Sequence, residues 1–139
     1  MPASRTAPTR PGPGAAATAT ATATAVMFAA TGTLHFLRPG IFDPIVPLRL
    51  PGSSRSWTYG SGAAELVLAA LVASHRFRNL GGLLAAVFLV AVFPANLRTV
   101  SIVRRQPLPV RVFVVARLPL QVPLIALALQ VGRSGGASR

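Results

Sequence analysis

The stretch that decides the fold is LGGLLAAVFLVAVFPANLRTVSIV (Leu80–Val103), an apolar run long enough to cross the roughly 30 Å core of a bilayer as a helix. Three more apolar segments lie at about residues 15–37, 58–74 and 110–131. Lipid-exposed backbone must satisfy its hydrogen bonds within helices or a closed barrel. The sequence therefore predicts an all-α, four-helix transmembrane bundle. The turn at residues 75–79 fits only an antiparallel hairpin, so we expect up-down-up-down order.

The composition agrees with a membrane protein and excludes several other classes. Of 139 residues, 52% are apolar and 12% are charged, about half the charged fraction of ordinary soluble domains. The formal net charge is +12, and every basic residue is arginine. Because these arginines are dispersed among apolar segments, they fit loops that meet anionic lipid and not a nucleic-acid-binding face. The chain has no cysteine, which excludes disulfides and thiolate-bound metal or iron–sulfur sites.

The first apolar segment contains the repeat ATATATATA at residues 17–25. Strict alternation is also typical of a strand, but alanine is the best helix former and a threonine hydroxyl can bond back to its own helix. We therefore predict a helix, with a cleaved signal peptide as the alternative. Residues 1–14 and 132–139 are predicted to be disordered tails around a membrane domain at 15–131.

Residues 38–57 separate the first two spans and contain four prolines, which makes a regular helix unexpected there. Their mixture of proline and aliphatic residues predicts a segment that lies on the membrane surface or folds back as a lid. Asp43 lies near Arg38 and Arg49 in the sequence, and we expect it to pair with one of them. The start of the second span has two aromatic residues suited to the headgroup level, Trp57 and Tyr59.

Polar residues of the four spans are predicted to gather in one half of the bundle. When antiparallel order is imposed, five polar side chains fall toward the end of the bundle opposite the chain termini. These candidate ligand-binding residues are His35, Glu65, Asn96, Arg117 and Gln121. His75 falls at the other end, as a solvated turn residue, which argues against a haem held by two histidines.

Glu65 and Arg117 are expected at equal depth, about seven residues into their spans. A charged side chain in hydrocarbon costs roughly 2.5–3.5 kcal/mol even on lenient scales, so each should seek a partner. The two residues are therefore predicted to form an ion pair. Such a pair either belongs to a ligand or proton site or only fixes how the helices dock.

Prolines inside the third and fourth spans are expected to free backbone carbonyls in the same half. Pro94 lies in the third span, and Pro119 and Pro123 lie in the fourth. Each removes a helical hydrogen bond and favours a kink. The freed carbonyls would make this half of the bundle more polar than its side chains alone.

Four blocks of the chain resemble the DoxX-like family of small bacterial membrane proteins. The blocks are GTLHFLRPGIFDPIVPLRLP (Gly32–Pro51), SGAAEL (Ser61–Leu66), FPANLR (Phe93–Arg98) and ARLPLQ (Ala116–Gln121). The matching positions include the five polar candidates, together with Pro39, Pro47, Pro94 and Pro119. The Ala/Thr repeat departs from the more apolar first helix expected of the family.

The resemblance implies a multi-pass protein of the bacterial plasma membrane with both termini in the cytoplasm. The arginines do not decide the orientation, because six lie on one side and seven on the other. Relatives in the family include a subunit of a thiosulfate:quinone oxidoreductase, a partner in a mycobacterial oxidative-stress complex and a protein needed to mature methylamine dehydrogenase. Most members have no assigned activity.

Three functions stay open from the sequence. The first is a structural or assembly partner of a membrane-associated complex. The second is a quinone-linked redox subunit; because the sequence offers no ligand set for a metal or covalent cofactor, electrons would pass through quinone or an oxidoreductase partner subunit. The third is a small-molecule carrier or binder, and a carrier of four helices would need to be a homo-oligomer.

Overall fold

The computed structural model describes residues 13–134, so most of the tails predicted at 1–14 and 132–139 lie outside the described residues. The described residues are all-helical, without strands. Two short 3₁₀ helices, η1 (Asp43–Ile45) and η2 (Val103–Arg105), and the single-turn α2 (Pro39–Phe42) join the longer elements. The five longer helices are α1 (Pro13–Leu37), α3 (Ser54–Ala73), α4 (Arg78–Ala91), α5 (Phe93–Ile102) and α6 (Leu108–Ser134).

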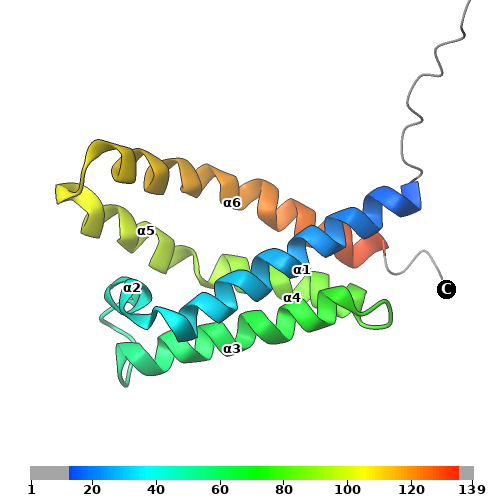
Figure 1. Ribbon diagram of the computed structural model, residues 1–139, viewed down its shortest axis with the longest axis horizontal. Helices are drawn as coiled ribbons and strands as arrows, with labels where there is room; N and C mark the ends of the chain where they lie inside the picture. Colours follow the sequence, from blue (N-terminus) through cyan, green and yellow to red (C-terminus); the bar gives the residue numbers. More distant parts are fainter. Residues whose placement is uncertain (1–12, 135–139) are drawn as a thin grey trace, which may run out of the picture.

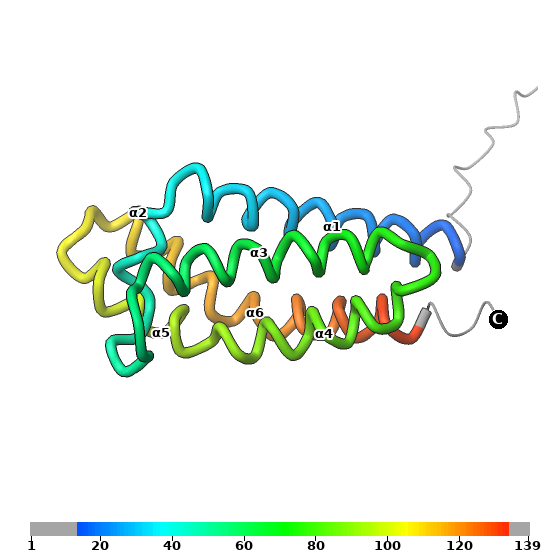
Figure 2. Tube along the Cα trace, turned by 90° about the horizontal axis from the view of Figure 1, so that it is seen from below, coloured from blue at the N-terminus to red at the C-terminus, as the bar shows by residue number. Residues whose placement is uncertain are grey.

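The long helices run antiparallel along one axis (Figure 1). Seen from below, α1 and α3 form one layer and α4 and α6 form the other (Figure 2). The start of α1, the end of α6 and the α3–α4 turn lie at one end, whereas α2, η1 and the α5–α6 bend lie at the other (Figure 1). The predictions of an all-α fold and of a helical hairpin at the α3–α4 turn are therefore confirmed.

The Ala/Thr repeat is helical and not a strand. Threonine hydroxyls donate to carbonyls one turn back, from Thr20 to Ala16 at 3.0 Å and from Thr24 to Thr20 at 2.9 Å. These bonds satisfy the hydroxyls within the helix, which is the reason the sequence favoured this interpretation. Helix α1 begins at Pro13 and α6 continues to Ser134, so both helices extend into the stretches predicted as tails.

The third predicted span is interrupted at the proline that the sequence singles out. Helix α4 ends at Ala91 and α5 begins at Phe93. Pro94 has no N–H to donate to the carbonyl of Val90, and the N–H of Val92 bonds to Phe88 and Val90 instead. In contrast, α6 stays a single helix through Pro119 and Pro123.

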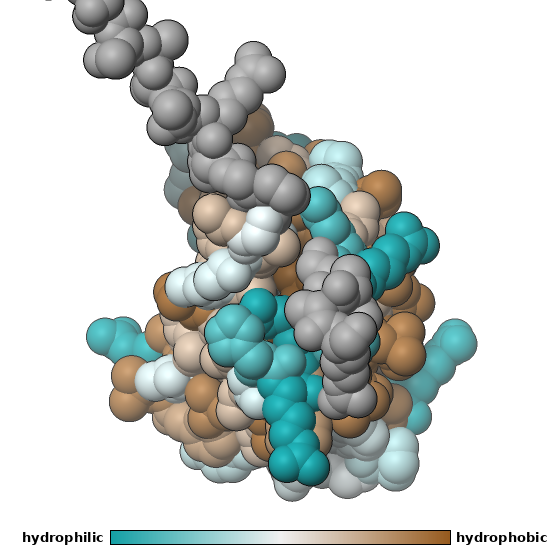
Figure 3. All heavy atoms as spheres, turned by 90° about the vertical axis from the view of Figure 1, so that its right-hand side faces the viewer, coloured by the Kyte–Doolittle hydropathy of each residue, from teal (hydrophilic) through white to brown (hydrophobic). Residues whose placement is uncertain are grey.

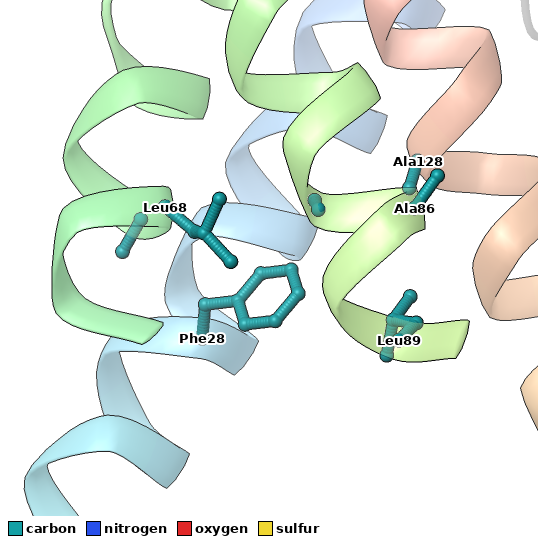
Figure 4. Packing of buried hydrophobic residues seen from close by; sticks show 7 residues of the cluster. Phe28, Leu68, Ala86, Leu89 and Ala128 are labelled. Carbon is teal, nitrogen blue, oxygen red and sulfur yellow. The ribbon is translucent and has the colours of Figure 1, made fainter. Parts of the chain in front are cut away.

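Small residues let the helices pack closely. The main core cluster contains Phe28 and Leu68 from the α1–α3 layer, and Ala86, Leu89 and Ala128 from the other layer (Figure 4). The alanines of this cluster, such as Ala86 on α4 and Ala128 on α6, let helix backbones approach closely, a common packing mode of membrane helices.

Glycines mark the closest approach within the second layer. A Cβ added to Gly82 on α4 would lie 2.4 Å from the backbone nitrogen of Gly132 and 2.6 Å from the carbonyl oxygen of Ala128, both on α6. Any side chain at Gly82 would therefore push α4 and α6 apart.

The outer faces of the helices are apolar. Val67 on α3 is 59% exposed, Val87 on α4 is 58% and Val122 on α6 is 71%. Hydrophilic side chains gather at the ends instead, as Figure 3 shows for the end that carries the α3–α4 turn. Two segments, Arg78–Arg105 and Leu108–Arg133, are long and apolar enough to cross a membrane by length and composition.

Candidate functional site: a cavity beneath the proline-rich segment

A cavity of about 470 Å³ lies at the end of the molecule that carries α2 and η1. Each of the five long helices and the proline-rich segment contributes to its wall. Most of the wall is apolar, and it includes three aromatic rings, those of Phe42, Trp57 and Phe88. The polar lining residues are His35, Thr58, Ser61, Glu65, Asn96 and Arg117.

Four of the five polar residues predicted from the sequence meet in this cavity. His35 comes from α1, Glu65 from α3, Asn96 from α5 and Arg117 from α6. The fifth, Gln121, is buried behind the wall and bonds to Asn96. His75 is exposed in the α3–α4 turn at the opposite end, as predicted.

His35 and Glu65 are both buried and face each other. Nδ1 of His35 lies 3.8 Å from Oε2 of Glu65 and 2.8 Å from the carbonyl oxygen of Thr31. The imidazole stacks on the ring of Phe42, with centroids 3.7 Å apart and planes 20° from parallel. Oε2 of Glu65 is buried and has no hydrogen-bond partner among the described residues.

Two glycines bring these side chains together. A Cβ on Gly62 would lie 2.7 Å from Cβ of His35, and a Cβ on Gly32 would lie 3.1 Å from Cβ of Glu65. Gly32 precedes His35 by three residues on α1, as Gly62 precedes Glu65 on α3. Each titratable side chain therefore lies over the glycine of the opposite helix, and the crossing fixes the geometry of the pair.

The predicted direct ion pair between Glu65 and Arg117 is not present. Within residues 13–134, the basic side chain within 4.0 Å of Glu65 is His35, and this contact is an ion pair only when the imidazole is protonated. Arg117 acts on Glu65 only through its charge at a longer distance. Equal depth does not bring the two side chains into contact, because α3 packs tightly on α1, whereas Arg117 belongs to the other layer and its residue surface is exposed.

Asn96 and Gln121 stabilise the break between α4 and α5. Nδ2 of Asn96 donates to Oε1 of Gln121 at 2.8 Å, and Nε2 of Gln121 donates to the carbonyl oxygen of Leu89. Leu89 lies near the end of α4, where the interruption disturbs the regular bonding pattern. Both amides were predicted as ligand-binding residues. The structure shows that they bond to each other and that Gln121 bonds to the backbone.

The proline-rich segment covers the cavity as a lid, which we define as residues 38–53. Its aliphatic residues Ile45, Val46, Pro47 and Leu50 line the cavity. It is shorter than the predicted segment because Ser53 caps α3, accepting a bond from the N–H of Ser56 at 3.1 Å.

Side chains of the helices hold this lid. Asp43 accepts from Nε of Arg55 at 2.9 Å and from the hydroxyl of Thr58 at 2.8 Å. Arg98 on α5 donates to the carbonyl of Pro44, and the indole of Trp57 donates to the carbonyl of Pro51. The expected pairing of Asp43 with Arg38 or Arg49 is wrong, because the first turn of α3 presents Arg55 to it. The bonds from Arg55 and then Thr58 hold the pKa of Asp43 below its usual value.

The donor set suits hydrogen bonding more than metal binding. No group of three or more His, Asp or Glu side chains between residues 13 and 134 is placed to hold a metal ion. The cavity instead combines a carboxylate, an imidazole, an amide and a guanidinium with aromatic walls. Such a lining can bind and orient a molecule that is apolar over most of its surface.

The cavity wall also contains three residues that were not predicted from the sequence, which are Thr58, Ser61 and Phe88. Thr58 and Ser61 precede Glu65 on α3, and helical spacing from Glu65 could have indicated them. The two glycines that set the His35–Glu65 geometry were also missed. Their signal is the matching pattern GTLH at 32–35 and GAAE at 62–65.

The fold and the site define an all-helical protein with a polar-and-aromatic cavity at one end of two helical layers. The chain belongs to the family described as "Domain of unknown function (DUF8561)", whose model matches residues 24–132. This range contains every residue of the cavity wall. Neither a curated protein nor a solved structure matches the chain.

Proposed function

We propose that the chain is a four-span membrane protein, with α1, α3, the α4–α5 pair and α6 as its spans. Helix α1 has 25 residues and α3 has 20, and about 20 residues are needed to cross a bilayer core. The apolar outer faces and the arginines at both ends, such as Arg76 and Arg104, suit lipid and headgroups respectively.

The relation to the DoxX-like family belongs to this proposal. Each of the four blocks that carry the resemblance contributes to the cavity, through His35, Glu65, Asn96 and Arg117 among others. Because four blocks that are distant in the sequence meet in one cavity, the resemblance to the family is better explained by a common site than by chance. A bacterial plasma-membrane location with both termini cytoplasmic follows from that relation.

The function that the geometry supports best is binding of a small amphiphilic molecule in the cavity. The observation that carries it is the convergence of His35, Glu65, Asn96 and Arg117 on one mostly apolar cavity of about 470 Å³. Ligand sites typically have volumes of roughly 300–1,000 Å³, apolar walls and a few placed polar groups. The lid covers the cavity at one end. A ligand would therefore enter from the surrounding lipid, which an apolar molecule can do.

Cavity filling tests the proposal. Ala95 on α5 lines the cavity, whereas Leu97 on the same helix is 48% exposed and does not. We expect native mass spectrometry to find a bound small molecule on the wild type and on Leu97→Phe but not on Ala95→Phe.

The single tryptophan, Trp57, also lines the cavity and gives a second measurement. In nanodiscs, decylubiquinone should quench Trp57 saturably in the wild type and in Leu97→Phe, and weakly in Ala95→Phe. A wild type with no bound mass and only linear quenching would contradict ligand binding.

A quinone-linked redox subunit is the second candidate. Three aromatic walls beside a guanidinium and an imidazole suit a ring that carries two carbonyl oxygens. Saturable quenching by decylubiquinone, with co-purification of an oxidoreductase partner, would favour this function. A structural or assembly partner is the remaining candidate, and it predicts that cavity variants change stability and complex formation without changing ligand occupancy.

A further inference from the structure

The unpaired oxygen of Glu65 constrains what the cavity can bind. Glu65 is 9% exposed and lines the cavity, and its Oε2 accepts no hydrogen bond from residues 13–134, with Nδ1 of His35 at 3.8 Å. A buried acceptor without a hydrogen bond destabilises the protein, and more so when it is charged. A ligand that donates a hydrogen bond to this oxygen would remove that destabilisation.

Three donors that line the cavity or lie beside Glu65 are bound elsewhere. Nδ1 of His35 is 2.8 Å from the carbonyl of Thr31, the hydroxyl of Thr58 donates to Asp43, and Nδ2 of Asn96 donates to Gln121. These bonds belong to the helix crossing, the lid and the α4–α5 break. An occupant of the cavity can supply the donor that Oε2 lacks.

Arg117 supplies the complementary group. It lines the same cavity and, within the described part of the chain, has no ion pair within 4.0 Å. A guanidinium offers only donors, and a carboxylate offers only acceptors. An occupant that touches both must therefore accept from one and donate to the other.

We propose that the ligand presents a neutral hydroxyl group, of an alcohol or a phenol, which donates to Oε2 of Glu65 and accepts from Arg117. This inference rests on the proposed function of ligand binding. A hydroxyl has one donor and two acceptor sites, which matches one unpaired oxygen and one guanidinium. An ammonium needs three acceptors, and a carboxylate would leave Oε2 unpaired.

Charge balance favours the same class. When the imidazole of His35 is neutral, the opposite charges of Glu65 and Arg117 balance around a neutral occupant, whereas an ion would add an uncompensated charge in a mostly apolar site. The rest of the ligand is apolar, because aromatic and aliphatic side chains form most of the wall. The ligand is therefore a hydroxylated hydrophobic molecule.

The experiment compares 4-hexylphenol with 4-hexylanisole, which has the same ring and tail but no hydroxyl donor. Binding to the protein in nanodiscs is measured by Trp57 fluorescence and titration calorimetry. Hydrogen bonds to charged groups are worth about 1.5–3 kcal/mol, so we expect the phenol to bind roughly 10- to 100-fold more tightly.

Two variants of Glu65 assign the preference to its side chain. Glu65→Met removes the acceptor at similar shape, and the preference for the phenol should disappear while anisole affinity stays unchanged. Glu65→Gln retains a carbonyl acceptor and should keep part of the preference. Leu66→Met, on the partly exposed neighbour, is the matched control and should behave as the wild type.

The outcomes separate this inference from the proposed function. Equal affinity for both probes in the wild type, with both excluded by Ala95→Phe, would overturn the hydroxyl inference while ligand binding stands. Failure of both probes to bind the wild type would overturn both. The comparison of the two probes on the wild type keeps the inference testable if Glu65→Met does not fold.

Discussion

Nδ1 of His35 on α1 lies 3.8 Å from Oε2 of Glu65 on α3, and this contact exists because two glycines let the helices cross closely. The pair lies beneath the lid, in the wall of the cavity. One crossing therefore fixes both the packing of the first helical layer and the polar end of the site.

Glu65 is predicted to couple energetically to His35 more strongly than to Arg117. Residues in contact show interaction energies of about 0.5–3 kcal/mol, whereas distant pairs are nearly additive. Double-mutant cycles with His35→Gln, Arg117→Gln and Glu65→Gln, measured by unfolding in detergent, should show this order. A larger coupling for Glu65–Arg117 would restore the ion pair predicted from the sequence and contradict the observed geometry.

Substituting the glycine at the crossing should destabilise the fold. A Cβ at Gly62 would lie 2.7 Å from Cβ of His35, and overpacking typically costs about 1–3 kcal/mol. Gly60→Ala is the matched control, because on the same helix its Cβ would meet nothing within 4 Å. Thermal unfolding should show a lower Tm for Gly62→Ala and an equal or higher Tm for Gly60→Ala. Similar behaviour of the two variants would rule out tight α1–α3 packing.

The amide pair at the α4–α5 break is predicted to be structural. Gln121→Ala leaves the buried Leu89 carbonyl and Asn96 amide unpaired, which costs about 1–3 kcal/mol. Adding Asn96→Ala should cost less than the sum of the two single changes. Gln106→Ala, at an exposed position before α6, serves as the control. An additive double mutant would show that the two amides act independently.

The lid should loosen in acid. The folded-state pKa of Asp43 is lowered by its bonds from Arg55 and Thr58, so its contribution to stability is present above the ordinary value of 3.8. That contribution is lost as the pH falls below this value through the lowered pKa. Trp57 reports the change, because its indole bonds to Pro51 of the lid. Asp43→Asn cannot ionise at this position and should lack the acid transition in Trp57 emission. A transition that survives this substitution would belong to another group.

The helices and their order were predictable because their signals are local. Apolar runs of span length, the hairpin at residues 75–79 and the break at Pro94 each follow from hydrophobicity or from a missing N–H. The gathering of His35, Glu65, Asn96 and Arg117 in one cavity also followed, because antiparallel order fixes the depth of each residue along the bundle axis.

The partners of the polar side chains were not predictable. The depth of a residue along the bundle axis does not tell which neighbouring helix its side chain faces. Glu65 meets His35 and not Arg117, since glycines on α1 and α3 decide which helices approach most closely. Asp43 meets Arg55 because the capped start of α3 turns that side chain toward the lid.

By itself, the sequence determined an all-helical antiparallel chain and the end of it at which polar groups collect, because local hydrophobicity and proline chemistry suffice for both. Only the tertiary structure decided which groups touch and which oxygen is left without a donor. Those outcomes depend on contacts between helices distant in sequence, where a single missing Cβ determines how closely two backbones approach.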